Sequence, residues 1–162
     1  MTGAAPTPPG SGGPSVPYGV LLPVSVHFDE LDAFGMLHNA RYAVLVERAW
    51  AAFWYAQGVG VTDGAQQAGN AQGDAFNVIK AFTITFEAPI TTTGPYAVHL
   101  WMERLGATSA TAGYRVCSPD GARTHAHGTR TVVRLDRDTL RPARWSDRVR
   151  ELSDLIAGPA RT

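Results

Sequence analysis

Asp32, Gly35 and Asn39 are the residues whose types and spacing are best suited to chemistry; they lie between Asp29 and Tyr42. A carboxylate can act as a general base or as a nucleophile. The first N–H groups of a helix lack internal partners and carry partial positive charge, which polarises a carbonyl oxygen. If a helix begins near Asn39, the segment offers both groups that attack on a carbonyl carbon needs. Asp and Gly also suit the first and fourth positions of a type I turn, so the residues alone leave both interpretations open.

The helix that would present these N–H groups is predicted from about Asn39 to Gly58. Apolar residues recur there at helical spacing and include three large aromatic side chains besides Tyr42, which implies that the rest of the domain covers this face. The stripe consists of Tyr42, Leu45, Val46, Ala49, Trp50, Phe53 and Trp54. Before the helix, residues 20–28 alternate, with Val24, Val26 and Phe28 on one face, which predicts a half-buried strand.

The chain after residue 75 reads as strands separated by turn signals. Their short connections favour antiparallel neighbours, so we expect a four-stranded meander. The predicted strands are 76–88, 96–105, 109–118 and 123–135, followed by a short helix capped by Ser146 with Val149, Leu152, Leu155 and Ile156 inward. The fold class is therefore predicted as α+β, one antiparallel sheet of five to six strands wrapped around one long central helix. The Gly-rich segment 58–74 is interpreted as a lid.

Composition places the chain among globular proteins of one domain. Of 162 residues, 44 % are hydrophobic and 17 % charged, and the formal net charge is zero, so neither nucleic acid nor a membrane is expected as a partner. Residues 1–17 are Pro- and Gly-rich and are predicted to be disordered, leaving 18–160 as the domain. Cys117 is the sole cysteine, which fits a reducing cytoplasm.

The order of several short motifs resembles the hotdog-fold thioesterases of the 4-hydroxybenzoyl-CoA thioesterase type. The resemblance covers nearly all of residues 20–156. Its first pattern is carried by Asp32, Gly35, Asn39, Tyr42, Glu47 and Ala49; Phe86-Glu-Ala-Pro89 and Arg104-Leu-Gly106 followed by Ser109 continue it. It implies hydrolysis of an acyl or aryl thioester to a free acid and coenzyme A.

The resemblance also implies roles for individual residues. The thioester oxygen would accept a hydrogen bond from the backbone N–H of Asn39, with His38 and Ala40 beside it. Asp32 would act as general base or nucleophile, and Gly35 would let the backbone pass close to the ligand. Two subunits would join their sheets edge to edge, giving a homodimer or homotetramer.

Other polar residues have simpler interpretations beside functional ones. Asn39 is a good N-cap, His38 at a helix start is more often structural, and Tyr42 is expected as core or pocket wall. Glu47 is expected to pair with a neighbouring strand or subunit, and Arg130 could meet coenzyme A phosphates, although a solvated charge row also explains it.

His125 and His127 share a strand face, but nothing completes a metal site, so no metal and no cofactor are expected. Three alternatives to an acyl-CoA thioesterase stay open: an acyl-carrier-protein thioesterase, a hotdog hydratase or dehydratase, and a catalytically idle module that binds acyl thioesters.

Overall fold

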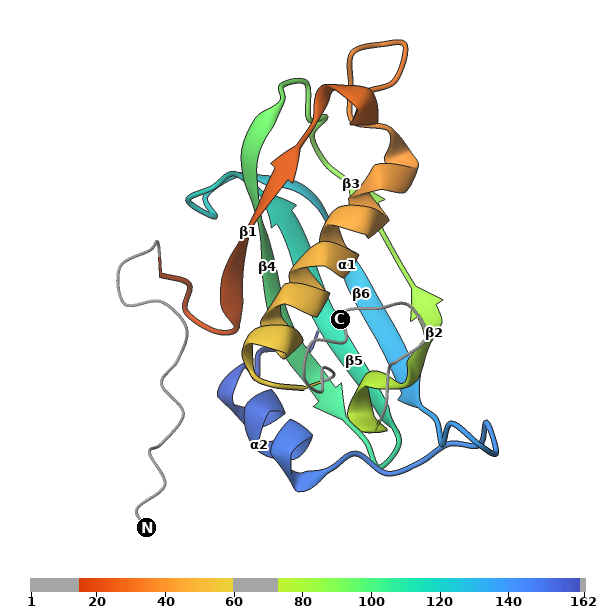
Figure 1. Cartoon of the computed structure of the whole chain (residues 1–162). Helices are drawn as coiled ribbons and strands as arrows, with labels where there is room; N and C mark the ends of the chain where they lie inside the picture. The colour runs from red at the N-terminus through yellow and green to blue at the C-terminus, as the bar shows by residue number, and fades with distance from the viewer. Residues whose placement is uncertain (1–14, 60–72, 161–162) are drawn as a thin grey trace.

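A six-stranded antiparallel sheet with one long helix across its face makes up most of the fold (Figure 1). The computed structural model describes residues 15–59 and 73–160. The strands are β1 (Val20–Val26), β2 (Asn77–Phe82), β3 (Thr85–Phe86), β4 (Gly94–Leu105), β5 (Ser109–Cys117) and β6 (Thr124–Arg134); the helices are α1 (Asn39–Ala56) and α2 (Asp147–Leu155). The predicted sheet around a central helix is confirmed. The predicted tail before residue 15 and residues 60–72 of the predicted lid lie outside the described residues.

The apolar stripe of α1 is buried as its spacing predicts. All seven residues of the stripe belong to the hydrophobic core between helix and sheet, joined there by Val98, Leu100, Tyr114 and Val132 among others. Aromatic side chains of this size supply much of the free energy that holds a helix on a sheet. The core therefore fixes where α1 begins, which is the point that matters for the site.

The predicted four-stranded meander is wrong, because the strands run β1-β4-β5-β6-β2 across the sheet. The strand expected beside β4 pairs with β6 instead, and the chain then crosses to the far side of the sheet, where β4 pairs with β1. The crossing segment, residues 87–93 between β3 and β4, is held against the start of α1 by two hydrogen bonds. Leu37 N–H donates to the Ile90 carbonyl at 2.8 Å, and Ile90 N–H donates to the Tyr42 hydroxyl at 3.4 Å.

Residues 76–88, predicted as one strand, form the two pieces β2 and β3. The break contains Thr83, whose N–H donates to the Thr129 carbonyl at 2.9 Å and whose carbonyl accepts from the Tyr114 hydroxyl at 2.7 Å. The Thr83 carbonyl also lies over Gly128, where a Cβ atom would stand 1.9 Å from its oxygen. A residue without a side chain is needed at this close approach.

Two apolar residues expected in the core are exposed. Phe28 is 83 % exposed because β1 ends at Val26 and the chain turns into a 3-10 helix at Phe28–Glu30. Leu155 is 61 % exposed at the end of α2, whereas Val149, Leu152 and Ile156 are buried as predicted. In the described ranges no helix combines the length and the apolarity needed to cross a membrane.

Gly128→Ala should destabilise the protein by about 2 kcal/mol, because the new methyl group must displace the Thr83 backbone. Urea denaturation measures the change in the free energy of unfolding. Gly106→Ala is the matched control, since its Cβ would lie 3.3 Å from the nearest atoms and a small shift suffices. Equal losses for the two variants would contradict the close approach at Gly128.

Candidate active site

The loop before α1 holds Asp32 in a defined turn. Asp32 N–H donates to the Met36 carbonyl at 2.7 Å, and Gly35, with φ of 73°, donates its N–H to the Asp32 carbonyl at 3.0 Å. The Asp32 side chain accepts from the N–H groups of Phe34 at 2.8 Å and Met36 at 3.1 Å, both through Oδ1. Within the described residues Oδ2 has no hydrogen-bond donor. One carboxylate oxygen therefore holds the turn while the other is available for chemistry.

The start of α1 departs from the predicted cap. His38, not Asn39, is the N-cap: its Nδ1 accepts from Ala40 N–H at 3.2 Å, and Asn39 is the first helical residue. Asn39 Oδ1 also accepts from Ala40 N–H, at 3.0 Å. A His ring nitrogen can cap as an oxygen does when it is unprotonated. The Asn39 N–H itself has no acceptor in the described part of the chain.

The electrostatics of this helix start favour an anion. No acidic residue lies in the first turn of α1, and Arg41 adds a positive charge there. Helix N-termini usually gain stability from a nearby carboxylate, because the unpaired N–H groups carry partial positive charge. The first turn itself supplies no such carboxylate, and its partial charge can stabilise a carbonyl oxygen that gains negative charge.

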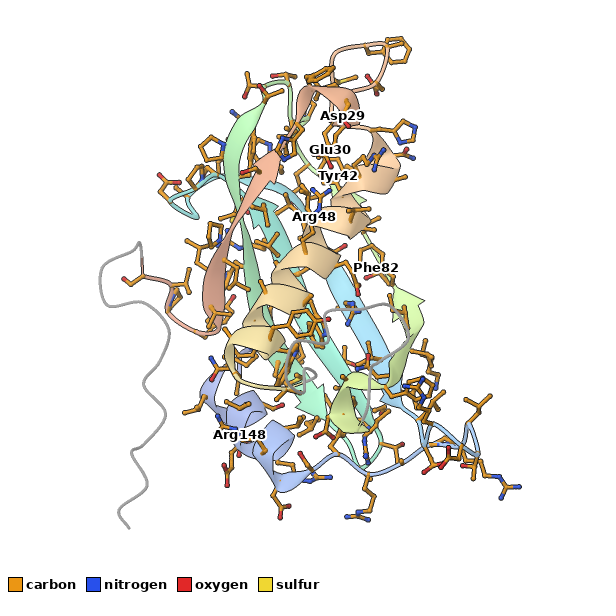
Figure 2. All side chains as sticks on the ribbon, in the orientation of Figure 1. Asp29, Glu30, Tyr42, Arg48, Phe82 and Arg148 are labelled. Atoms are coloured by element: carbon orange, nitrogen blue, oxygen red, sulfur yellow. The ribbon has the colours of Figure 1, made fainter. Side chains whose placement is uncertain are left out.

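Glu30 anchors the loop to the helix. It is almost fully buried, its Oε1 pairs with Arg48 Nη1 at 3.1 Å, and its Oε2 accepts from His27 N–H at 2.9 Å. The Glu30 carbonyl accepts from His38 N–H at 3.0 Å, so the same residue fixes the cap. Figure 2 shows Glu30 beside α1, with Arg48 and Tyr42 on the helix. Both carboxylate oxygens of Glu30 are engaged structurally, whereas neighbouring Asp29 is exposed.

An open cleft of about 430 Å³ brings the loop and the helix start together. Its walls are Asp32, Met36, Leu37, His38, Asn39, Tyr42, Phe86, Glu87, Ala88 and Pro89. Four of the predicted site residues, Asp32, His38, Asn39 and Tyr42, thus share one cleft. Gly35 and Ala40 lie in the adjoining turn and helix without lining it, and the Ala40 N–H is already used by the cap.

The opposite wall was missed as part of the site, although Phe86 to Pro89 carry the family resemblance. Phe86 packs edge to face on Tyr42 with ring centroids 5.1 Å apart. Burial raises the pKa of the Tyr42 hydroxyl, and the N–H of Ile90 donates to it and opposes this effect. Tyr42 therefore stays neutral and forms a wall, as expected. Glu87 pairs with His127 Nε2 at 2.8 Å, which ties this wall to β6.

His127 is therefore engaged with a carboxylate, and its neighbour His125 contacts the Ala88 carbonyl through Nδ1 at 3.1 Å. Within residues 15–59 and 73–160 no three His, Cys, Asp or Glu side chains gather closely enough to hold a metal ion.

Arg130 lies away from the cleft. It is 3 % exposed, pairs with Glu47 Oε2 at 2.7 Å, and lines a separate cavity between α1 and the sheet. Phosphates are strongly hydrated, so a guanidinium this buried does not fit the expected contact with coenzyme A phosphates. The expected pairing of Glu47 with a neighbouring strand is confirmed, since Arg130 is on β6.

Known structures share this fold. The PA5185 protein of Pseudomonas aeruginosa is 18 % identical, with a TM-score of 0.76, and the alignment covers 89 % of this chain and 95 % of that one. A thioesterase-superfamily protein of Jannaschia sp. is 21 % identical with a TM-score of 0.70, covering 89 % of both chains. A Thermus thermophilus thioesterase, solved with coenzyme A and Zn, is 22 % identical with a TM-score of 0.64, covering 83 % and 96 %.

The sequence itself identifies the family. No curated protein matches the chain at a significant level. The family profile described as the thioesterase-like superfamily matches residues 26–152, which include the loop, α1, the whole sheet from β2 to β6 and most of α2. The chain therefore belongs to the thioesterase-like superfamily.

Proposed function

We propose that the protein hydrolyses an acyl-CoA to a free acid and coenzyme A in the cleft at the start of α1. The observation that carries this proposal is the presence in one cleft of an Asp32 oxygen and an Asn39 N–H that have no hydrogen-bond partner among the described residues. Thioester hydrolysis needs a group that activates water or attacks the carbonyl carbon, and a donor for the oxygen that gains charge. The cleft offers both without any cofactor.

Each wall has a separate part in this mechanism. The Asn39 N–H, with the partial positive charge of the helix start and Arg41 beside it, donates a hydrogen bond to the developing oxyanion. Asp32 Oδ2 acts from the loop, either by removing a proton from water or by attacking the carbonyl carbon. Because Oδ1 is held by two N–H groups, the carboxylate keeps a fixed orientation during either step. Gly35 supplies the left-handed backbone that this turn requires.

The alternative functions agree less well with the contacts of the cleft residues. A hydratase or dehydratase would need His38 as an acid or base, yet its Nδ1 caps the helix. An idle binding module would have no use for an oriented carboxylate with an available oxygen. Coenzyme A is favoured over a carrier protein because a Thermus relative of the same fold is a thioesterase solved with coenzyme A. A cytoplasmic enzyme agrees with the lone, buried Cys117.

Asp32→Asn should lower kcat by at least about 100-fold, because an amide cannot act as base or nucleophile. Asn keeps an Oδ1 acceptor, so the turn and the free energy of unfolding should change little. Thiol release from a panel of acyl-CoAs provides the assay, and Asp29→Asn, on the exposed side of the loop, is the matched control. Thiol release that persists in Asp32→Asn would exclude this mechanism, and no release by the unmodified protein would favour the idle module.

His38→Ala should cost about 1 kcal/mol of stability, because the first turn of α1 loses its cap. Its kcat should also fall, since a frayed first turn misplaces the Asn39 N–H. His38→Ser restores a capping acceptor and should recover both quantities, measured by urea denaturation and by thiol release. If stability recovers in the Ser variant and kcat does not, then His38 acts on the substrate directly and is not a positioning residue.

The protein should be a dimer or tetramer, with β2 as the joining edge. This edge strand exposes Val78 at 45 %, and the neighbouring Phe86 of β3 is 50 % exposed. Unpaired strand edges with apolar side chains favour pairing with a second copy. Sedimentation or light scattering gives the mass, and Val78→Asp should shift it toward the monomer. A monomeric mass of the unmodified chain at micromolar concentration would contradict the assembly.

A further inference from the structure

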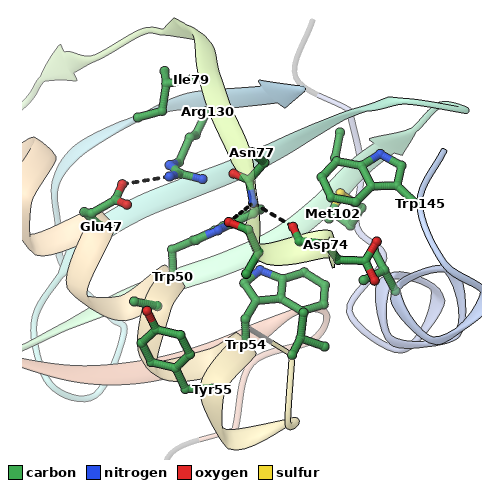
Figure 3. Close-up of a pocket in the computed structure, with 15 residues that line it drawn as sticks. Glu47, Trp50, Trp54, Tyr55, Asp74, Asn77, Ile79, Met102, Arg130 and Trp145 are labelled. Atoms are coloured by element: carbon green, nitrogen blue, oxygen red, sulfur yellow. Dashed lines mark hydrogen bonds and ion pairs between the residues drawn. The ribbon is translucent and has the colours of Figure 1, made fainter. Parts of the chain in front are cut away.

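A second, inner cavity lies between α1, the edge of the sheet and α2 (Figure 3). Its volume is about 200 Å³. Four aromatic side chains, Trp50, Trp54, Tyr55 and Trp145, line it together with Met102 and Ile79. Apolar cavities of about 150 Å³ are known to hold a six-membered ring, so this cavity is large enough for a ring that bears a small substituent.

Four donor atoms on residues that line the inner cavity lack acceptors within the described chain. Arg130 is 3 % exposed, and only its Nη2 is paired, with Glu47 at 2.7 Å. Its Nε and Nη1, and the indole N–H groups of Trp54 and Trp145, are buried and have no hydrogen-bond partner within the described chain. A buried donor without a partner costs about 1–3 kcal/mol, and a charged one costs more. Four such atoms around one cavity indicate that it is built to receive acceptors.

The acidic groups nearby do not satisfy these donors. The Asp74 carboxylate accepts from Ser146 N–H and its hydroxyl and lies 3.3 Å from Arg134 Nε. The Glu47 side chain, which pairs with the buried Arg130 guanidinium, is 54 % exposed, so this carboxylate lies at the solvent boundary and not inside the cavity. Desolvation lowers the pKa of Arg130, and Glu47 opposes this effect only in part. The guanidinium, which stacks on Trp50 with 4.5 Å between Cζ and the ring centroid, would be stabilised by a further anion.

The inner cavity is distinct from the cleft that contains Asp32. The two share no lining residue. From Asn39 in the cleft to Glu47 in the cavity, α1 advances about 12 Å along its axis. Arg130 and Glu47 have no part in the mechanism given above.

We propose that the inner cavity is a second binding site, which takes a small monocarboxylate with a compact ring as its apolar part. The carboxylate accepts from Arg130 and the indole N–H groups, and the ring packs among the tryptophans. The site does not depend on thioester hydrolysis, so its test is a binding measurement without any thioester.

The probe is cyclohexanecarboxylate, added to the full chain and followed by calorimetry and by tryptophan fluorescence. Three of the four tryptophans line the cavity, so occupancy should change the emission. One equivalent should bind the unmodified protein, and cyclohexanecarboxamide, which has the same shape without the charge, should bind about tenfold more weakly. Absence of binding, or equal affinity for both compounds, would overturn the proposal and would mean that water satisfies these donors.

Variants locate the probe and separate binding from folding. Arg130→Met, similar in length and apolar, should abolish binding while the protein stays folded by circular dichroism. Glu47→Gln removes the competing carboxylate and should tighten binding of the acid, but not of the amide, by about tenfold. Asp32→Asn, in the cleft, should leave the affinity unchanged. An Asp32→Asn effect as large as that of Arg130→Met, or weaker binding of the acid to Glu47→Gln, would overturn the assignment.

Discussion

The apolar face of α1 packs on the sheet, and this contact fixes the positions of the cleft at the helix start and of the inner cavity. Each large side chain in the stripe contributes about 2–3 kcal/mol when it is buried. The helix can neither slide nor rotate without exposing several of them at once. Its first N–H groups are consequently held in the cleft, and Glu47 and Trp50, about two to three turns later, are held at the inner cavity. The geometry that the proposed mechanism requires is thus a consequence of core packing.

The loop that carries Asp32 is tied to the core through buried Leu37 and needs a further restraint nearer Asp32. Buried Glu30 supplies it through three different contacts: its carboxylate to Arg48 of α1, its other oxygen to the His27 N–H, and its carbonyl to the His38 N–H. An ion pair with one buried partner contributes modestly to stability but strongly to orientation. Glu30, two residues before Asp32, therefore holds the loop that carries Asp32.

Most of the fold followed from the sequence because the signals were periodic. The stripe of α1, the β1 alternation as far as Val26 and the Ser146 cap each depend on local spacing, and the structure agrees with them. Strand order does not depend on local spacing. Ile90 holds the crossing segment against Leu37 and Tyr42, which lie far from it in the sequence. The short connection before β4 suggested a hairpin because this distant contact could not be seen in the sequence. The break at Thr83 depends equally on Gly128, a single residue on another strand.

The predicted site residues also divide into those that local spacing could place and those that it could not. Asp32, His38, Asn39 and Tyr42 were found because they are close in sequence and follow one motif. Arg130 was misplaced because a strand's two faces look alike in sequence, and a charged residue is by default assigned to solvent. Its burial could be inferred only by pairing it with Glu47, which stands off the apolar stripe at the edge of the helix. Arg130 departs from the pattern of β6 and Glu47 from the apolar stripe of α1, and the two side chains form an ion pair at the edge of the core. That arrangement leaves part of the guanidinium without an acceptor, and so produces a polar spot inside an aromatic cavity.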